Sequence, residues 1–433
     1  MNILLVNPPN CGRSIPEERY GITSIKQIFR GEPLGLMELA GNLTGHEVRL
    51  LDLKADPNGL NKEMSTFSPD VIGLTSLTCE ANTVVALARQ LRDYGPATVV
   101  VGGIHASNDP NFFNQEGIDF IVSGLGKRSF AELVTKLELQ DLSSALPAGV
   151  LRVTPGKPLA RQARRCDATD LVETWPAAYH LVERYRDFYV LERLGLRMGL
   201  VASAYGCTHA CTFCAMHGQT GGSYLGRPVA GVVRDIELLP ENIPVVRLVD
   251  ANTFGDTDRA MLLAEALMGS GMRKHYLADV RSDTVVRQPQ MMAKWAKAGL
   301  RAVVIGFEAV DDAELESMNK ANKAAMNDEA IDILHGLGIA IVGDFIISPE
   351  AEERHFDILQ SYLHTHAIDL PMLTVMTPLP GTPLYRQQYH KITNHNLDYY
   401  TLTNAVLPTR LAEERFYAAY AELISEGHRQ ARL

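Results

Sequence analysis

Residues 200–214 read LVASAYGCTHACTFC, a short apolar run that leads directly into three cysteines. The apolar part, Leu200–Ser203, predicts a buried β-strand. Cys207, Cys211 and Cys214 follow it with the spacing C-x3-C-x2-C. Three thiolates on one loop can hold three irons of a [4Fe–4S] cluster, and the fourth iron then stays open to another ligand.

Zinc is the alternative that these residue types leave open. A structural zinc ion takes four ligands, so His209 or His217 would have to complete the set. A disulfide framework is disfavoured, because the other three cysteines are scattered along a long chain, at Cys11, Cys79 and Cys166. These three are interpreted as ordinary thiols.

Downstream of the cysteines the chain alternates apolar strands with helical stretches. Counted from the first strand, the predicted strands are Leu200–Ser203, Val245–Val249, Tyr276–Asp279, Ala302–Ile305, Ile339–Ile347 and Asp369–Val375. Six such units predict a partial (β/α)6 barrel, in which functional groups gather at the carboxyl ends of the strands.

Upstream of the cysteines the same alternation predicts a doubly wound α/β parallel sheet. Its expected strands are Ile3–Val6, Glu47–Leu51, Val71–Leu74, Thr98–Val101 and Ile118–Val122. Such sheets bind ligands at the carboxyl ends of their strands. Those ends carry prolines, hydroxyls and glycines: Asn7-Pro8-Pro9, Thr75-Ser76, Gly102-Gly103 and Gly124.

The expected organisation is a sheet domain over 1–145, a linker over 146–198, the barrel over 199–385 and a C-terminal helical cap over 386–433. A chain of 433 residues has room for two or three domains. The basic run Arg161–Arg165 in the linker is interpreted as a solvated face or a phosphate contact.

Composition narrows the class of function. Of the chain, 46% is hydrophobic and 21% is charged, and the formal net charge is −10. This is a globular composition, and an acidic balance disfavours non-specific binding of nucleic acid. No apolar run is long enough to cross a membrane, and the N-terminus lacks the pattern of a signal peptide. We therefore expect a cytoplasmic protein with no transmembrane segment.

The cysteine motif resembles that of the radical S-adenosylmethionine superfamily. The resemblance implies that Cys207, Cys211 and Cys214 bind the cluster, and that its open iron chelates S-adenosylmethionine. Motifs similar to that superfamily's continue to residue 385, among them Gly306-Phe307-Glu308, whose glutamate would contact the ribose. The residues assigned to S-adenosylmethionine by this resemblance are Phe213, Asp250, Asn252, Glu308, Ile346 and Pro378.

The N-terminal domain resembles the cobalamin-binding domain. Pro9 stands where the motif D-x-H-x-x-G has its cobalt-binding histidine, so the resemblance implies base-off cobalamin with no histidine from the protein. The residues assigned to cobalamin are Asn7, Pro8, Pro9, Thr75, Ser76, Gly102, Gly103, His105 and Gly124. His105 is expected to hydrogen-bond or cap at the tail site rather than to bind cobalt.

Two rival interpretations of this domain remain: a sheet that has lost its ligand, and a dinucleotide-binding domain. The second would need G-x-G-x-x-G after the first strand, where the chain has Pro8-Pro9.

The chain departs from the family pattern in three places. Tyr205 stands where an arginine is common, and Ser348 stands where a glycine is expected. Leu125 and Lys127 replace the two acids of a Gly-Glu-Gly-Glu element.

Together the two halves resemble the class B radical enzymes, which include protoporphyrin ester cyclases and hopanoid methylases. The resemblance implies methylation of an unactivated carbon of a small organic substrate, through a 5′-deoxyadenosyl radical and methylcobalamin. It also implies an electron donor such as flavodoxin or ferredoxin. The alternatives are a non-methylating cyclase or oxidase, and a catalytically silent cobalamin- or redox-responsive binding protein.

Overall fold

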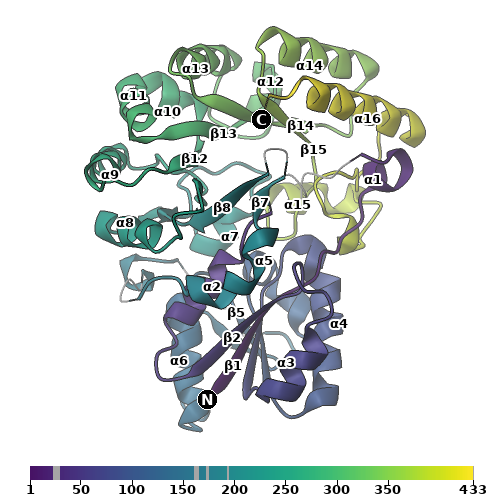
Figure 1. Cartoon of the computed structure of the whole chain (residues 1–433). Helices are drawn as coiled ribbons and strands as arrows, with labels where there is room; N and C mark the ends of the chain where they lie inside the picture. The colour runs from purple at the N-terminus through teal and green to yellow at the C-terminus, as the bar shows by residue number, and fades with distance from the viewer. Residues whose placement is uncertain (23–29, 160–164, 172–174, 193–194, 433) are drawn as a thin grey trace.

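The computed structural model describes residues 1–22, 30–159, 165–171, 175–192 and 195–432 (Figure 1). Of the basic run 161–165, only Arg165 belongs to the described residues, and its Nε donates to Ser223 Oγ at 3.1 Å. The rest of that run lies outside them. No helix among the described residues is long and apolar enough to cross a membrane.

The N-terminal sheet is doubly wound, as predicted. Its strand order is β2-β1-β3-β4-β5-β6, with the first five strands parallel and β6 antiparallel to β5. The bounds are β1 (Asn2–Asn7), β2 (Glu47–Asp52), β3 (Val71–Leu74), β4 (Thr98–Val101), β5 (Phe120–Val122) and β6 (Val150–Arg152). The order reverses between β1 and β3, which is where such sheets open a ligand crevice.

Helices cover both faces of this sheet because β1 buries apolar side chains on both. Ile3 and Leu5 pack against one pair of helices, and Leu4 and Val6 pack against another pair. The first pair is α2 (Leu34–Gly41) and α6 (Gly126–Glu138), and the second is α3 (Leu60–Phe67) and α4 (Ala81–Leu91). A sheet buried on both faces is typical of parallel α/β folds.

The second sheet is the predicted partial barrel. Its order is β15-β14-β13-β12-β11-β8-β7; six strands are parallel, and β7 (Val190–Leu191) is antiparallel to β8. The parallel strands are β8 (Leu196–Val201), β11 (Val245–Leu248), β12 (His275–Val280), β13 (Leu300–Glu308), β14 (Ala340–Ile347) and β15 (Leu370–Val375). The covering helices are α8 (Val229–Glu237), α9 (Thr257–Gly269), α11 (Pro289–Ala298), α13 (Ala324–Gly336) and α14 (Glu353–Thr365).

The C-terminal segment ends in α16 (Glu413–Gln430), which packs against α14 and β15. The hydroxyl of Tyr420 donates to the carbonyl of Leu373 at 2.7 Å. The last helix therefore closes the β15 side of the barrel, as the expected helical cap.

The segment 146–198 adds a strand to each sheet, β6 to the first and β7 to the second. It also buries a 3₁₀ helix, Tyr179–Phe188, against both units. The division of the chain at residues 145, 198 and 385 stays our proposal.

The two sheets share one apolar core. Met37 on α2, Tyr179 and Leu200 on β8 belong to the same buried cluster. Polar contacts cross the same boundary: the backbone N–H of Leu200 donates to Glu32 Oε1 at 2.7 Å, and the Tyr189 hydroxyl donates to Asp52 Oδ2 at 2.9 Å. In Figure 1, α2, α5 (Ile104–Asn108) and α7 (Met216–Thr220) lie between the lower sheet and the barrel.

Candidate cofactor sites

The cysteine loop lies between β9 (Ala204–Tyr205) and α7, just beyond the carboxyl end of β8. The chain turns into it at Gly206, whose φ is +76°. A Cβ there would lie 2.2 Å from the carbonyl oxygen of Ser223. Only glycine fits this turn, for two reasons. A Cβ would clash with backbone, and other residues rarely adopt a left-handed φ.

Asp250, at the end of β11, anchors the start of this loop. Its Oδ1 accepts from the backbone N–H groups of Ser203 and Ala204 at 2.7 and 2.8 Å, and its Oδ2 accepts from Ser203 Oγ at 2.7 Å. The Nη2 of Arg259 donates to the carbonyl of Ser203 at 2.6 Å. These three bonds favour a role for Asp250 in positioning the cysteine loop, and its expected contact with S-adenosylmethionine stays a prediction.

The far side of the loop is held by two other strand ends. The backbone N–H of Thr212 donates to Met318 O at 3.0 Å, and Asn319 Nδ2 donates to Ala210 O at 2.8 Å. The backbone N–H of Leu384, in the first turn of α15 (Pro383–Gln388), donates to Thr212 O at 2.9 Å. The loop is therefore braced by segments that follow β13 and β15.

The three cysteines are half-buried on this braced loop. Burial raises the pKa of the Cys214 thiol to about 11, and burial also raises the pKa of Cys211. Iron must therefore displace the protons when it binds, since the thiolate is the ligand.

Among the described residues, no three His, Cys, Asp or Glu side chains converge as ligands of a single metal ion. A cluster does not need such convergence, because each cysteine binds a different iron. The three cysteines fit a [4Fe–4S] cluster. Among the described residues, no group of His, Cys, Asp or Glu side chains matches a zinc site.

Glu308 occupies a strained position at the end of β13. Its φ is +66°, next to a register shift between β13 and β14. Its Oε1 lies 2.6 Å from Lys320 Nζ, and both side chains are buried. A Cβ at Gly306 would lie 2.4 Å from that same oxygen, so this glycine makes the room for the pair. Strained backbone held by a buried pair is typical of ligand sites.

The other predicted S-adenosylmethionine residues lie at neighbouring strand ends. Phe213 from the cysteine loop and Ile346 from β14 pack on one apolar cluster, which brings them together. Asn252 is buried, and its Oδ1 has no hydrogen-bond partner among the described residues. Pro378 is buried in the segment after β15. A buried oxygen without a partner and apolar side chains at neighbouring strand ends both suit a nucleoside.

The carboxyl edge of the N-terminal sheet holds a close backbone approach at Gly103. Its φ is +98°, and a Cβ there would lie 2.6 Å from the backbone nitrogen of Ser76 and 2.8 Å from Thr75 Oγ1. The N–H of Gly102 donates to Leu74 O at 2.8 Å. The structure thus brings together the predicted residues of β3 and β4.

The remaining predicted cobalamin residues flank this approach. Ser107 Oγ donates to Gly103 O and accepts from the N–H of Gly124, both at 2.9 Å, which ties the ends of β4 and β5. Asn7 Nδ2 donates to Asp52 Oδ1 at 2.8 Å. Pro8 is buried and Pro9 half-buried, directly after β1.

His105 is fully buried in this edge and makes edge-to-face contacts with the rings of Phe112 and Phe113, at centroid distances of 5.2 and 5.5 Å. Neither ring nitrogen has a partner among the described residues. Burial lowers the pKa of His105 to about 4, so the ring is neutral. Two ring nitrogens without partners, close in the chain to Gly102 and Gly103, fit a ligand with amide groups, such as cobalamin.

Comparison with known proteins finds a family for each half of the chain. Residues 25–134 match the B12 binding domain, and residues 201–357 match the radical SAM superfamily. The chain is therefore a cobalamin-dependent radical S-adenosylmethionine enzyme, and the predicted fold class is confirmed.

Relatives span most of the chain. Hopanoid C-3 methylase from Methylococcus capsulatus is 28% identical over 401 residues, covering 90% of this chain and 75% of the relative. Anaerobic magnesium-protoporphyrin IX monomethyl ester cyclase from Synechocystis is 24% identical over 408 residues, covering 89% and 77%. The methyltransferase TsrM from Kitasatospora setae, solved with cobalamin and a [4Fe-4S] cluster, shares the fold with a TM-score of 0.74 at 17% identity, over 98% of this chain and 90% of TsrM.

Sequence reasoning missed several residues of the site. Lys320 lies twelve residues after Glu308, and the register shift at the end of β13 accompanies its pairing with that glutamate. Glu38 carries no local motif, although the departures at Lys127 and Tyr205 mark the two positions that meet it.

Proposed function

We propose that this enzyme transfers a methyl group to an unactivated carbon of a small organic substrate. The observation that carries the proposal is the contact between the two cofactor edges. Asn108, at the end of α5, donates from Nδ2 to the carbonyl of Ala215 at 2.9 Å, and Ala215 follows Cys214 directly. A radical site and a methyl carrier must be adjacent for carbon methylation, and this contact supports that adjacency.

The names of the relatives support the same reaction. They include the hopanoid C-3 methylase and two bacteriochlorophyllide methyltransferases of Chlorobaculum tepidum. The cyclases are also related, so ring formation without methyl transfer is the second candidate.

Each group of residues has a separate task in this proposal. When bound, the cluster supplies the electron that cleaves S-adenosylmethionine, and cobalamin carries the methyl group. Glu308 accepts hydrogen bonds from the ribose, held in place by Lys320. The buried Oδ1 of Asn252 accepts a hydrogen bond from the same ligand, and Phe213 and Ile346 offer it apolar surface.

We further propose that cobalamin binds base-off and without a histidine from the protein on cobalt. Pro9 cannot bind a metal, and His105 is buried against two phenylalanines. The cobalt signal of the reduced cofactor, measured by electron paramagnetic resonance (EPR), should show no nitrogen hyperfine splitting. Such splitting would contradict this part of the proposal.

His105 is expected to bind the cobalamin tail. Replacing it, His105→Leu, should weaken cobalamin binding about 10-fold, the worth of one hydrogen bond. The dissociation constant is measured by the change in cobalamin absorbance. An unchanged constant would remove His105 from the site.

The main experiment uses anaerobically reconstituted full-length protein with dithionite, or with flavodoxin or ferredoxin as the proposed electron donor. We expect both 5′-deoxyadenosine and S-adenosylhomocysteine as products. Replacing Cys207, Cys211 and Cys214 together by alanine should abolish the cluster absorption and 5′-deoxyadenosine. If the wild type forms 5′-deoxyadenosine without S-adenosylhomocysteine, methyl transfer is wrong and the cyclase candidate replaces it.

A further inference from the structure

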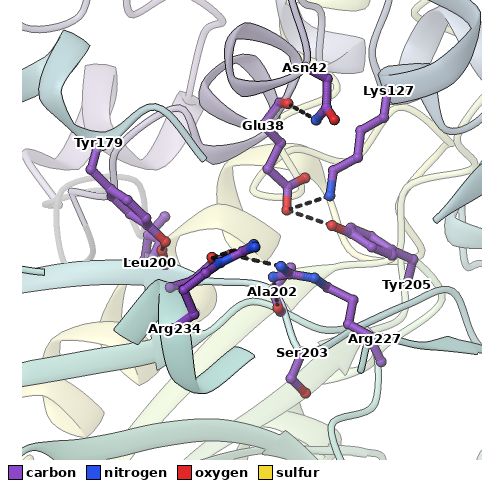
Figure 2. A network of polar contacts seen from close by, with 12 residues as sticks. Glu38, Asn42, Lys127, Tyr179, Leu200, Ala202, Ser203, Tyr205, Arg227 and Arg234 are labelled. Carbon is purple, nitrogen blue, oxygen red and sulfur yellow. Dashed lines mark hydrogen bonds and ion pairs between the residues drawn. The ribbon is translucent and has the colours of Figure 1, made fainter. Parts of the chain in front are cut away.

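A buried carboxylate links the N-terminal domain to the start of the cysteine loop. Glu38 on α2 is 7% exposed, and Lys127 on α6 is 8% exposed. The hydroxyl of Tyr205 donates to Glu38 Oε1 at 2.5 Å, and Lys127 Nζ lies 3.6 Å from the same oxygen. Figure 2 shows the two side chains meeting Glu38 from different elements. We call these three residues the Glu38 triad.

The members of the triad need one another. A buried carboxylate is costly unless a cation or hydrogen-bond donors satisfy it, and Lys127 and Tyr205 supply both. Lys127 Nζ also lies 5.2 Å from the centre of the Tyr205 ring, within the range of a cation–π contact. Removing either partner therefore changes the environment of the other.

The triad connects the two cofactor sites. Lys127 stands in the first turn of α6, three residues after Gly124 at the cobalamin edge. Tyr205 stands two residues before Cys207. Glu38 thus links the segment that follows Gly124 to the segment that precedes Cys207.

The two positions that contact Glu38 are also those at which the chain departs from its family's pattern. The family commonly has an arginine at position 205 and an acid at position 127. This chain has Tyr205 and Lys127 instead, and both share Glu38. The two departures therefore meet at one buried carboxylate.

The opposite end of the cysteine loop has its own contact with the N-terminal domain. Asn108 Nδ2 donates to Ile104 O and to Ala215 O, each at 2.9 Å. Gly218 leaves the room for it, because a Cβ there would lie 2.1 Å from Asn108 Oδ1. Residues 207–214 are therefore tied to the N-terminal domain on both sides.

We infer that the Glu38 triad positions the cysteine loop against the cobalamin edge, so that the N-terminal domain sets the geometry of the cluster. Tyr205, Glu38 and Lys127 are positioning residues, and none of them touches the reacting atoms. The inference rests on the proposed function for its cofactors, but the contact itself belongs to the apoprotein.

The test exchanges the charges singly and together. Lys127→Glu places a second carboxylate beside Glu38, and Tyr205→Arg adds a second cation beside Lys127. The double variant Lys127→Glu/Tyr205→Arg puts a guanidinium between two carboxylates. We expect Lys127→Glu to lower the melting temperature of the apoprotein by several degrees, and the double variant to recover most of that loss.

The reconstituted variants provide the second readout. Lys127→Glu should shift the EPR spectrum of the reduced cluster at unchanged iron content, and slow substrate-free formation of 5′-deoxyadenosine about 10-fold or more, because small displacements of reacting groups are costly. The double variant should restore both. As a matched control, Tyr420→Phe removes a buried hydroxyl bonded to Leu373 O far along the chain. It should lower stability and leave the cluster spectrum unchanged.

Two results would overturn the inference. Additive effects of the two substitutions on melting temperature would show that positions 127 and 205 are not coupled. A cluster spectrum and cleavage rate that do not move in Lys127→Glu would show that the triad only stabilises the fold. Failure of the proposed function looks different: the wild type would then form no S-adenosylhomocysteine, while the coupling in melting temperature persisted.

Discussion

At the scale of single residues, His105 makes stability depend on pH. Burial holds its pKa at about 4 in the folded chain, against 6.5 for the exposed ring. The unfolded chain therefore takes up a proton first, so stability is full above pH 6.5 and falls as the pH drops towards 4. This difference in pKa corresponds to about 3 kcal/mol.

His105→Leu should remove that part of the pH dependence. Its free energy of unfolding should fall less than that of the wild type between pH 6.5 and 4, in denaturant titrations at several pH values. Near pH 7 the two proteins should be similar, because neither ring nitrogen has a partner to lose among the described residues. If the free energies of unfolding of the two proteins fall equally between pH 6.5 and 4, His105 is not the source of this pH dependence.

Lys320 offers a second test at this scale. Lys320→Met leaves Glu308 as a buried carboxylate without its cation, which should cost about 3 kcal/mol or more. The matched control is Lys323→Met, since Lys323 pairs with Asp312 at 3.4 Å on the surface, where its side chain is 65% exposed. That loss should stay below about 1 kcal/mol. If Lys320→Met and Lys323→Met lose the same free energy of unfolding in urea titrations, the buried pair is not a source of stability.

At the scale of elements, the close approach of the segments that follow β3 and β4 depends on Gly103. Gly103→Ala adds a Cβ 2.6 Å from the backbone nitrogen of Ser76, so the ends of the two strands must move apart. We expect a loss of stability and of cobalamin binding, measured by melting temperature and cobalamin absorbance. Gly45→Ala is the control: its φ is +81°, but nothing lies within 4 Å, so it should cost only about 1–2 kcal/mol of backbone strain. Cobalamin binding that survives Gly103→Ala would place the cofactor elsewhere.

The same scale shows what the sequence could predict. The six barrel strands and the five parallel strands of the first sheet follow from apolar runs, since each run is buried and local. β6 escaped prediction because Val150–Arg152 is too short to carry a period. The hydrogen-bond partners of Asp250 could not be predicted either, since Ser203 and Ala204 are distant from it in the chain.

At the scale of the whole molecule, the shared core predicts that the two sheets unfold together. Glu32 and Arg186 are ion-paired inside this core, and the pair also receives the backbone N–H of Leu200 from the barrel. Calorimetry of the full chain should therefore show one cooperative transition. Two well-separated transitions would contradict the shared core.

Arg186→Met should lower the melting temperature of that single transition. Burial already raises the pKa of Glu32 to about 7, so without the guanidinium the carboxyl would take up a proton. The loss should therefore be larger above pH 7 than below it, when melting temperatures are compared across pH. Arg19→Met is the control, because Arg19 forms an exposed pair with Glu413 at 3.0 Å. A loss no larger than the control's would refute the structural role of the pair.

The sequence by itself determined the class of this protein. Apolar periodicity predicted both sheets, and the spacing of Cys207, Cys211 and Cys214 predicted the cluster, because these signals are local in the chain. Tertiary structure alone decided which partner each polar group meets: Lys320 with Glu308, Asn108 with Ala215, and both departures from the family pattern with Glu38. Such contacts join residues far apart in the chain, and a buried charge finds its partner only when the whole molecule has folded around it.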